Sequence, residues 1–467
     1  MANFREEKDT MGIVRVPENA HYGAQTQRAV ENIAIGDLKM PRDFIRALAL
    51  IKAAAAEVNR RLGLLDPERS EAIAAAAREV LEGRWDDQFV VGVFQTGSGT
   101  SSNMNVNEVI ASRANEMLTG RKGGKVPVHP NDHVNLGQSS NDAVPSAIHI
   151  AALQSIRSRL VPALHRLQEA LSAKAEAFAD VRKIGRTHLQ DAVPMTLGQE
   201  FSGYARQVEL GVERLASIEP RLSELALGGT AVGTGVNAHP EFAAAAVAWI
   251  ARATGIDFCK ARNHFEAQAA RDAAVEASGT LKTVAVSLAK IANDLRWLGS
   301  GPRCGIGEIR LPSLQPGSSI MPGKVNPVIP EAVLQMAAQV AGSDTTITLC
   351  GLGGNFELNT MMPLIAHHLL QSIALLADAA VALADKCITG IAANREACAA
   401  FIERSLALVT GLVPRIGYDR AAAVAKEAYD SGRTIREVLT AEAILPEEEI
   451  DRLLDIGNAS ILLRKNE

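Results

Sequence analysis

The sequence predicts an all-α protein, and three observations carry this prediction. Aromatic residues make up only 4% of the 467 residues. Alanine and leucine are frequent instead, which favours closely packed helices over sheets. In several long stretches apolar residues recur three and four positions apart, as they do along one face of a helix, and the most regular stretch covers residues 281–298.

Residues 1–138 are expected to form an N-terminal domain of short helices and loops. Helical periodicity predicts helices over residues 48–62 and 70–81. A Gly-, Ser- and Asn-rich segment over residues 86–107 interrupts the pattern, and a helix is expected to resume only after it. A basic loop broken by glycine and proline follows at residues 120–130.

Residues 139–393 are expected to form a central domain of five long helices. The predicted helices begin near residues 140, 196, 281, 331 and 363. Long helices in succession are typical of an elongated bundle. Small residues lie on several faces of these helices, so more than one face is expected to be buried. We therefore expect the chain to form an oligomer.

Residues 394–467 are expected to form a small C-terminal domain of short helices. Such a set could also suggest a DNA-binding helix-turn-helix, but the acidic run at residues 447–449 argues against that reading. The formal net charge of -5 and the pI of about 6.1 favour neither nucleic acid nor an anionic membrane as a partner. The sequence therefore predicts binding of small molecules and of other copies of the chain.

The chain is expected to be a soluble cytoplasmic protein. Its five cysteines are odd in number and contain no CxxC pair, which indicates free thiols in a reducing compartment. The N-terminal segment is charged and lacks the apolar core of a signal peptide. No uninterrupted apolar run approaches the roughly 20 residues that a membrane span needs.

A loop at residues 316–328 is the first candidate site. Glycine and proline breaks keep this segment out of regular helix or strand. It carries two adjacent hydroxyls, Ser318 and Ser319, together with the cation of Lys324 and the amide of Asn326. Such a loop can close over a small anion, with the lysine as counter-charge. The alternative interpretation is an ordinary polar surface loop.

A second candidate lies at residues 95–108. Gly97 and Gly99 leave backbone N–H groups exposed, and Ser98 and Thr100 add hydroxyl donors just before a helix. A helix N-terminus with such a lead-in binds carboxylate or phosphate. No Gly-Lys-Ser/Thr follows, so the segment is not a P-loop. The alternative is a simple capping loop.

A third candidate lies at residues 129–142. His129, Asp132 and His133 are residue types that bind metals, but their amide and hydroxyl neighbours are poor zinc ligands, so no metal is expected. The long helix that follows begins with further donors for an anion, and these are Ser139, Ser140 and Asn141.

A fourth candidate lies at residues 185–199, where Thr187 and His188 are expected to precede a helix. A single histidine is more often structural than catalytic, but polar, irregular surroundings favour a proton-transfer role for His188. Such a histidine needs an orienting carboxylate. Glu331, at the start of the helix after the 316–328 loop, is the candidate.

Together these segments resemble a known family. GSSIMPGKVNP resembles the signature of the fumarase/aspartase superfamily, and the wider chain resembles the class II, iron-independent fumarate hydratases almost end to end. The other matching segments are MGIVRVP, GAQTQRAVEN, TGSGTSSNMNVNEVIA, HPNDHVN, QSSND, GRTHLQDAVPMTLGQEFSGY, LALGGTAVGTGVN, KIANDLRWLGSGPRCGIGEI and GNFELN. THLQDA is the more specific motif, because aspartases typically carry Gln at the position of His188.

The resemblance implies three helical domains, with five-helix bundles that form a twenty-helix core in a homotetramer. Each active site would then be shared by three subunits. The implied reaction is the reversible hydration of fumarate to L-malate through an aci-carboxylate carbanion, a step of the tricarboxylic acid cycle, with no metal or organic cofactor. The alternatives are an aspartate ammonia-lyase, which His188 argues against, and a non-catalytic structural homologue, which would be free to lose its catalytic groups.

The resemblance also implies roles for residues. Ser318 would be the base that takes the C3 proton, and His188, paired with Glu331, would handle the hydroxyl or water, with Lys324 as the positive charge. The implied substrate-binding residues are Ser98, Gly99, Thr100, Ser139, Ser140, Asn141, Thr187, Ser319, Lys324, Val325 and Asn326. The implied secondary anion site consists of His129, Pro130, Asn131 and Asp132.

The implied chemistry requires a positively charged site. Removing a proton next to a carboxylate creates a doubly charged carbanion, so the site must concentrate cations and N–H donors there. The chain departs from the family at Gly137, where serine is usual, and at Ala143-Val144-Pro145, where Thr-Phe-Pro is usual. Both departures leave the donors at residues 139–141 in place.

Overall fold

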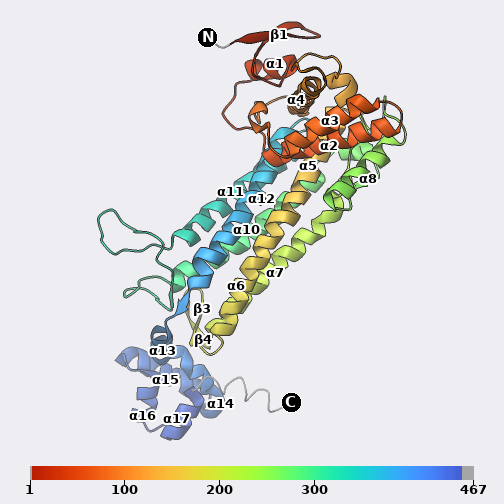
Figure 1. The fold of residues 1–467 in the computed structure, drawn as a ribbon. Coiled ribbons are helices and arrows are strands. Elements are labelled where there is room, and N and C mark those ends of the chain that lie inside the picture. The colour runs from red at the N-terminus through yellow and green to blue at the C-terminus, as the bar shows by residue number, and fades with distance from the viewer. Residues whose placement is uncertain (1–2, 455–467) are drawn as a thin grey trace. The chain divides into compact units, whose positions relative to one another are not determined.

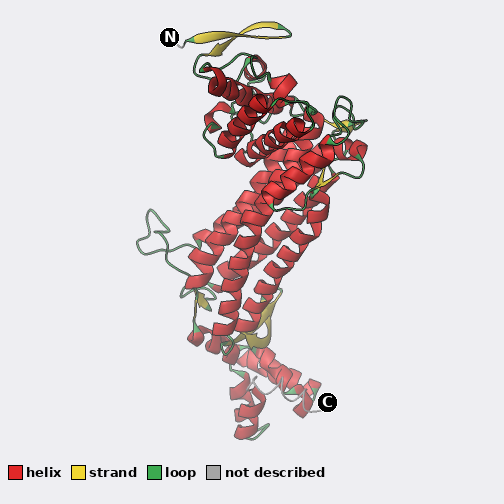
Figure 2. Ribbon diagram, turned by 45° about the vertical axis from the view of Figure 1, so that its right-hand side comes forward, coloured by secondary structure: helices red, strands yellow, loops and turns green. Residues whose placement is uncertain are grey.

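The computed structural model of the protein describes residues 3–454, and most of them are helical (Figures 1 and 2). The helices are α1 (Ala24–Asn32), α2 (Arg42–Arg61), α3 (Pro67–Leu81), α4 (Thr100–Thr119), α5 (Ser140–Ser155), α6 (Val161–Ala177), α7 (Leu197–Leu222), α8 (Phe242–Thr254), α9 (His264–Ala269), α10 (Asp272–Leu298), α11 (Val328–Gly351), α12 (Met362–Ala382), α13 (Arg395–Arg404), α14 (Val413–Ile416), α15 (Tyr418–Ser431), α16 (Ile435–Ala441) and α17 (Glu447–Leu454). The predicted all-α class is confirmed.

The strands of the described chain are short and pair two by two. The antiparallel pairs are β1 (Phe4–Asp9) with β2 (Gly12–Pro17), β3 (Arg182–Thr187) with β4 (Gln190–Thr196), β7 (Ile309–Arg310) with β10 (Ala392–Ala393), and β8 (Gly354–Asn355) with β9 (Leu358–Asn359). The parallel pair is β5 (Glu224–Leu225) with β6 (Cys259–Lys260). These pairs secure loops and form no layer of their own.

The described chain divides into two compact units, each made of three segments. The first unit comprises residues up to 163, 211–286 and 336–378. The second comprises residues 164–210, 287–335 and 379 onward. The three-domain division at residues 138/139 and 393/394 stays a prediction.

Four of the five long helices begin within three residues of their predicted starts, whereas α10 begins at Asp272, nine residues before the predicted start at 281. The first begins at Ser140, and a capping box formed by Ser139 and Asp142 explains why it begins there. A π-helical segment, η3 (Ile156–Leu160), interrupts it before α6. The remaining four are α7, α10, α11 and α12. The apolar periodicity of these helices marks the buried face of each, but it does not fix every boundary.

Two local expectations were wrong. Residues 100–107 were expected in an irregular segment but belong to α4, where Asn103, Asn105 and Asn107 are buried polar residues with partners inside the protein. Residues 182–196 form the β3–β4 hairpin instead of an irregular approach to a helix. The sequence hid this hairpin because its two-residue turn, His188-Leu189, contains neither glycine nor asparagine.

One helical stretch, Met362–Gly390, is long and apolar enough to cross a membrane by length and composition. Polar residues such as His367 and Gln371 interrupt it. Over half of its most apolar window, 56%, is buried within the protein, as expected for a core helix. The stretch is therefore weak evidence for a membrane span.

In the first unit α2 is the central helix. Fourteen of its 20 residues are buried, and it packs against α3, α4, α5 and α8. Six of the fourteen buried residues are alanines, which allow the helix axes to approach closely. The buried positions include one lysine, Lys52, whose surroundings are described below.

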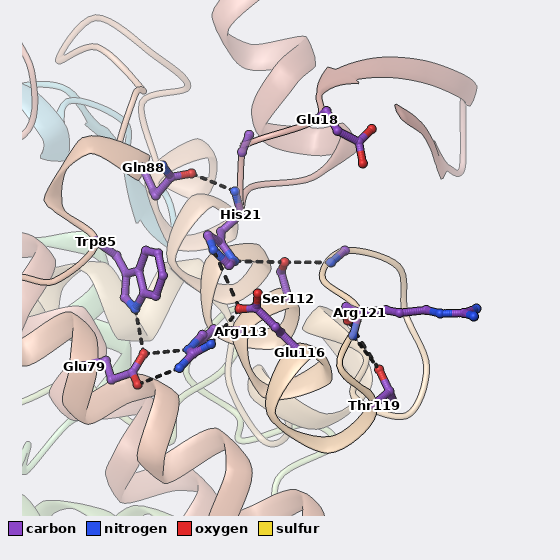
Figure 3. A network of polar contacts seen from close by, with 12 residues as sticks. Glu18, His21, Glu79, Trp85, Gln88, Ser112, Arg113, Glu116, Thr119 and Arg121 are labelled. Atoms are coloured by element: carbon purple, nitrogen blue, oxygen red, sulfur yellow. Dashed lines mark hydrogen bonds and ion pairs between the residues drawn. The ribbon is translucent and has the colours of Figure 1, made fainter. Parts of the chain in front are cut away.

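A polar network around His21 ties the N-terminal segment to α4 in the first unit (Figure 3). Ser112 Oγ lies 3.4 Å from His21 Nδ1 and accepts a hydrogen bond from the Gly123 backbone N–H at 2.8 Å. The imidazole centroid lies 4.3 Å from that of Trp85, and burial lowers the pKa of His21. These contacts secure the basic loop at residues 120–130 and are structural.

Candidate active site

The second predicted segment brings two helix N-termini together in the first unit. Gly99 is the N-cap of α4 with φ 73°, and a side chain there would come within 2.9 Å of Val144. Thr100 Oγ1 lies 2.7 Å from Ser98 Oγ and 2.6 Å from Ser140 Oγ. The starts of α4 and α5 thus share one row of hydroxyls, where an anion would meet donors and two positive helix ends.

The start of α5 is held by a buried carboxylate. Asp142 accepts hydrogen bonds at 2.9 Å from the backbone N–H groups of Ser139, Gly228 and Thr230. Burial raises the pKa of Asp142 to about 6, and these N–H donors oppose the rise. The amide of Asn141 donates to the Ala231 carbonyl at 2.8 Å. Asp142 therefore both caps α5 and joins it to the 228–231 loop.

Lys52 lies beneath these segments and was not singled out from the sequence. Its side chain is fully buried, and Nζ donates to Asn103 Oδ1 at 2.7 Å, Asn135 Oδ1 at 3.0 Å and Gln138 Oε1 at 2.8 Å. Burial lowers the pKa of Lys52 to about 7, and the field of Asp142 partly opposes this. In the sequence, a single lysine inside the apolar run LALIKAAAAEV is the feature that indicates this buried position.

The implied secondary anion site lies on a π-helical turn, η2 (Pro130–Val134). His129 Nδ1 accepts hydrogen bonds from the backbone N–H groups of Asn131 and Asp132, each at 3.1 Å. The backbone N–H of His129 in turn donates to His133 Nδ1 at 2.8 Å. Both rings therefore cap the turn, and burial lowers the pKa of each. Nowhere among the described residues do three metal-binding side chains gather.

The 316–328 loop lies in the second unit and is closed by its own hydrogen bonds. The Gly317 N–H donates to the Lys324 carbonyl at 2.7 Å, and the Asn326 amide donates to the Gly317 carbonyl at 2.7 Å. Ser318 Oγ accepts from the backbone N–H groups of Ile320 at 3.2 Å and Met321 at 3.0 Å. These two donors would stabilise negative charge on Oγ.

His188 lies at the exposed tip of the β3–β4 hairpin, also in the second unit. His188 and Leu189 both have left-handed backbone angles, with φ 56° and 59°. Thr187, Ser319, Lys324 and Val325 are likewise exposed. Within the described part of one chain no hydrogen bond joins His188 to Glu331. That pairing stays a prediction.

A buried group of charges supports the hairpin. Lys183, on β3, is fully buried with its Nζ 3.3 Å from Glu308 Oε2 and 3.1 Å from Glu200 Oε2. Arg186 Nη1 lies 3.0 Å from both carboxylate oxygens of Glu308, which is itself fully buried. Sequence reasoning missed this group. In the sequence, this group is indicated by two cations three residues apart, Lys183 and Arg186, which lie on one short strand.

Comparison with known proteins decides the family. The model of a family described as "Lyase" matches residues 12–342, and a model described as "Fumarase C C-terminus" matches residues 408–458. A class II fumarate hydratase of Nitrosomonas europaea is 56% identical over 455 residues, covering 97% of this chain and 98% of the relative. The chain belongs to the class II fumarate hydratase family. The resemblance stated from the motifs is thereby confirmed.

Further members of the fumarate hydratase family give the same result. A class II fumarate hydratase of Mycobacterium tuberculosis is 56% identical over 460 residues, covering 97% of this chain and 96% of the relative. The structure of a class II fumarase from Schistosoma mansoni is similar, with a TM-score of 0.94 and 40% identity over 97% of this chain and 98% of that one. A fumarate lyase/delta-crystallin structure from Brucella melitensis gives a TM-score of 0.93, with 48% identity over 97% of this chain and 98% of that chain.

Proposed function

We propose that the protein is a hydro-lyase that interconverts fumarate and L-malate. The observation that carries this proposal is the 56% identity, over nearly the whole length, with relatives that bear the name fumarate hydratase class II. The candidate groups in this chain are suited to that reaction. The first unit presents neutral donors and helix N-termini for a carboxylate, and the second presents a serine, a histidine and a lysine for the reacting part.

The dehydration direction can be written with these groups. Ser318 Oγ, as its alkoxide, takes the proton from C3 of L-malate and becomes a hydroxyl, and the electron pair of the broken C–H bond moves into the neighbouring carboxylate to give the aci-carboxylate. The N–H groups that point at Ser318 Oγ lower the cost of its negative charge. The C2 hydroxyl then leaves as water with a proton from His188, and the double bond forms. Lys324 offsets the charge that develops on the carbanion.

The same proposal covers assembly and location. We infer a homotetramer in which three subunits supply each site, because the implied residues lie on segments far apart in the sequence. Exposed site residues such as His188 and Lys324 fit a pocket completed by other copies. The reaction needs no metal or organic cofactor in this scheme. All five cysteines are free thiols, which fits a cytoplasmic enzyme.

The test is an ultraviolet assay of fumarate with purified protein. Formation of fumarate from L-malate, and its loss in the reverse direction, would support the proposal. Formation from aspartate alone would assign the ammonia-lyase reaction instead, and no reaction with either substrate would indicate a non-catalytic homologue. Light scattering on the same sample measures the assembly. A fully active monomer would contradict the shared site.

A further inference from the structure

We infer that Lys52 is a positioning residue of the dicarboxylate site, and that it fixes the segments on which the substrate-binding hydroxyls of the first unit are carried. The inference rests on the proposed function. It concerns a residue on α2, which lies outside every motif that the sequence analysis singled out. Lys52 touches no predicted substrate-binding residue directly, so its effect must pass through its hydrogen-bond partners.

The ammonium group of Lys52 is fully used by these partners. It has three N–H donors, and three side-chain oxygens lie within 3.0 Å of Nζ, those of Asn103, Asn135 and Gln138. Asn135 Oδ1 accepts two more hydrogen bonds, from the amides of Asn103 and Asn107, each at 3.1 Å. All these oxygens converge on one point. They can converge because the ammonium group is a cation. Around a neutral group the carbonyl dipoles would face and repel one another.

The partners of Lys52 belong to the two segments that carry the candidate hydroxyls. Asn103 lies one turn after Thr100 on α4, and Gln138 directly precedes Ser139 at the start of α5. The 2.6 Å contact between Thr100 and Ser140 joins the two segments at their ends. Lys52 therefore joins the same two segments at a second point, through its hydrogen bonds to Asn103 and Gln138. Loss of its hydrogen bonds would release both helix starts, on which the positions of the hydroxyls depend.

The charge of Lys52 also remains available to an anion. No carboxylate of the described residues lies within ion-pair distance of its Nζ. The nearby Asp142 is engaged by three backbone N–H groups, which already disperse its charge. The protonated lysine thus adds to the positive ends of α4 and α5. Burying a charge costs free energy, so a residue that served only packing at this position would be expected to be apolar, such as methionine.

The test compares Lys52→Met with the wild-type enzyme, with Lys174→Met as a control in which a partly buried lysine of the second unit is changed. We expect the KM for fumarate and for L-malate to rise about tenfold in Lys52→Met, as for the loss of charge-assisted hydrogen bonds, while kcat falls less than about threefold. Inhibition by succinate, which cannot react, should weaken by the same factor. Lys174→Met should match the wild type in all three measurements.

A second variant keeps the inference testable if Lys52→Met does not fold. Gln138→Leu removes one acceptor and leaves the lysine in place, and the KM is expected to rise about threefold. A KM within error of the wild type in folded Lys52→Met, or in Gln138→Leu when the first does not fold, would overturn the inference. So would a loss of thermal stability with KM unchanged. If the wild type itself turned over neither substrate, the proposed function would fail first, and the inference with it.

Discussion

Two fully buried lysines distinguish the two units of the chain. Lys52, in the first unit, meets three neutral amide oxygens, whereas Lys183, in the second, meets the carboxylates of Glu200 and Glu308. The first arrangement leaves a positive charge beneath the hydroxyls that are proposed to bind substrate. The second cancels its charge and supports the hairpin that carries His188. Under the proposed function, a buried cation serves binding in one unit and rigidity in the other, depending on which partners surround it.

The largest expected effect is on stability and concerns Lys183. Lys183→Met leaves Glu308 with less compensation for its buried charge, so the free energy of unfolding is expected to fall by roughly 3–5 kcal/mol. Denaturant unfolding of the purified variant measures this. The double variant Lys183→Met/Glu308→Gln should lose less than the sum of the single variants, because the two residues interact. A loss below about 1 kcal/mol in Lys183→Met would remove the distinction between the two lysines.

The next prediction tests the proposed catalytic role of the second unit by measuring activity. Ser318→Ala and His188→Asn, both in the second unit, are each expected to lower turnover by roughly two orders of magnitude or more, because they remove the proposed base and the proton donor. Steady-state assays with L-malate measure this. The controls Ser313→Ala and His165→Asn change exposed residues of the same types and should match the wild type. Near wild-type rates in both test variants would remove the mechanism and leave the fold standing.

A pH series tests the environment of Lys52. Its pKa of about 7 in the folded protein lies below the ordinary 10.5, so between these values the unfolded chain binds more protons than the folded one. The free-energy cost of burying protonated Lys52 is therefore present in full below pH 7 and falls as pH rises above 7. The difference in unfolding free energy between wild type and Lys52→Met should rise from pH 7 to pH 9, by at most about 1.4 kcal/mol per pH unit. A constant difference would contradict this.

The next prediction concerns the proposed binding role of the first unit, where a substitution is expected to have a smaller effect than those above and to act on KM. Thr100→Val removes the hydroxyl that joins Ser98 to Ser140, and the KM for fumarate should rise about fivefold while kcat changes less. Thr440→Val, an exposed threonine of α16, is the control. A Thr100→Val enzyme with a lowered kcat and an unchanged KM would show that the first unit takes part in the chemical step, and would contradict its proposed role in binding.

The smallest effect concerns an exposed ion pair of the second unit. Arg395 and Asp180 are paired at 2.8 Å, but their side chains are 58% and 72% exposed. Solvent screens such a pair, so Arg395→Ala should leave the thermal midpoint unchanged within error. A large fall would show that burial is not what separates Lys183 from a surface cation.

The sequence was sufficient for the long helices and for the residues that resemble family motifs. Apolar periodicity placed α7, α10 and α12 because each has a continuous buried face. It failed at α4, whose first turns contain asparagines that are buried and hydrogen-bonded, since composition cannot distinguish a satisfied polar helix from a loop. It also failed at the β3–β4 hairpin, because local sequence gives little signal for a left-handed turn at His188 and Leu189.

The supporting residues of the site were beyond sequence reasoning for a different reason. Lys52 and Glu308 lie far along the chain from the groups they contact, and a single charge in an apolar stretch does not reveal its partner. Only the packed structure shows that one lysine meets amides and the other carboxylates. Burial and partner identity are tertiary properties, and no periodicity encodes them.

The hairpin turn that carries His188 has a consequence for how this scaffold can acquire new chemistry. Since the imidazole is presented by a two-residue reversal of the chain, exchanging that residue leaves the pairing of Lys183 with Met195 and the strands on either side untouched. Asparagine and glycine, which accept such backbone angles readily, would fit there without remodelling. If His188 has the proposed role toward the leaving group, evolution or an engineer could change that group by altering a single codon, while the residues proposed to bind the diacid stay the same.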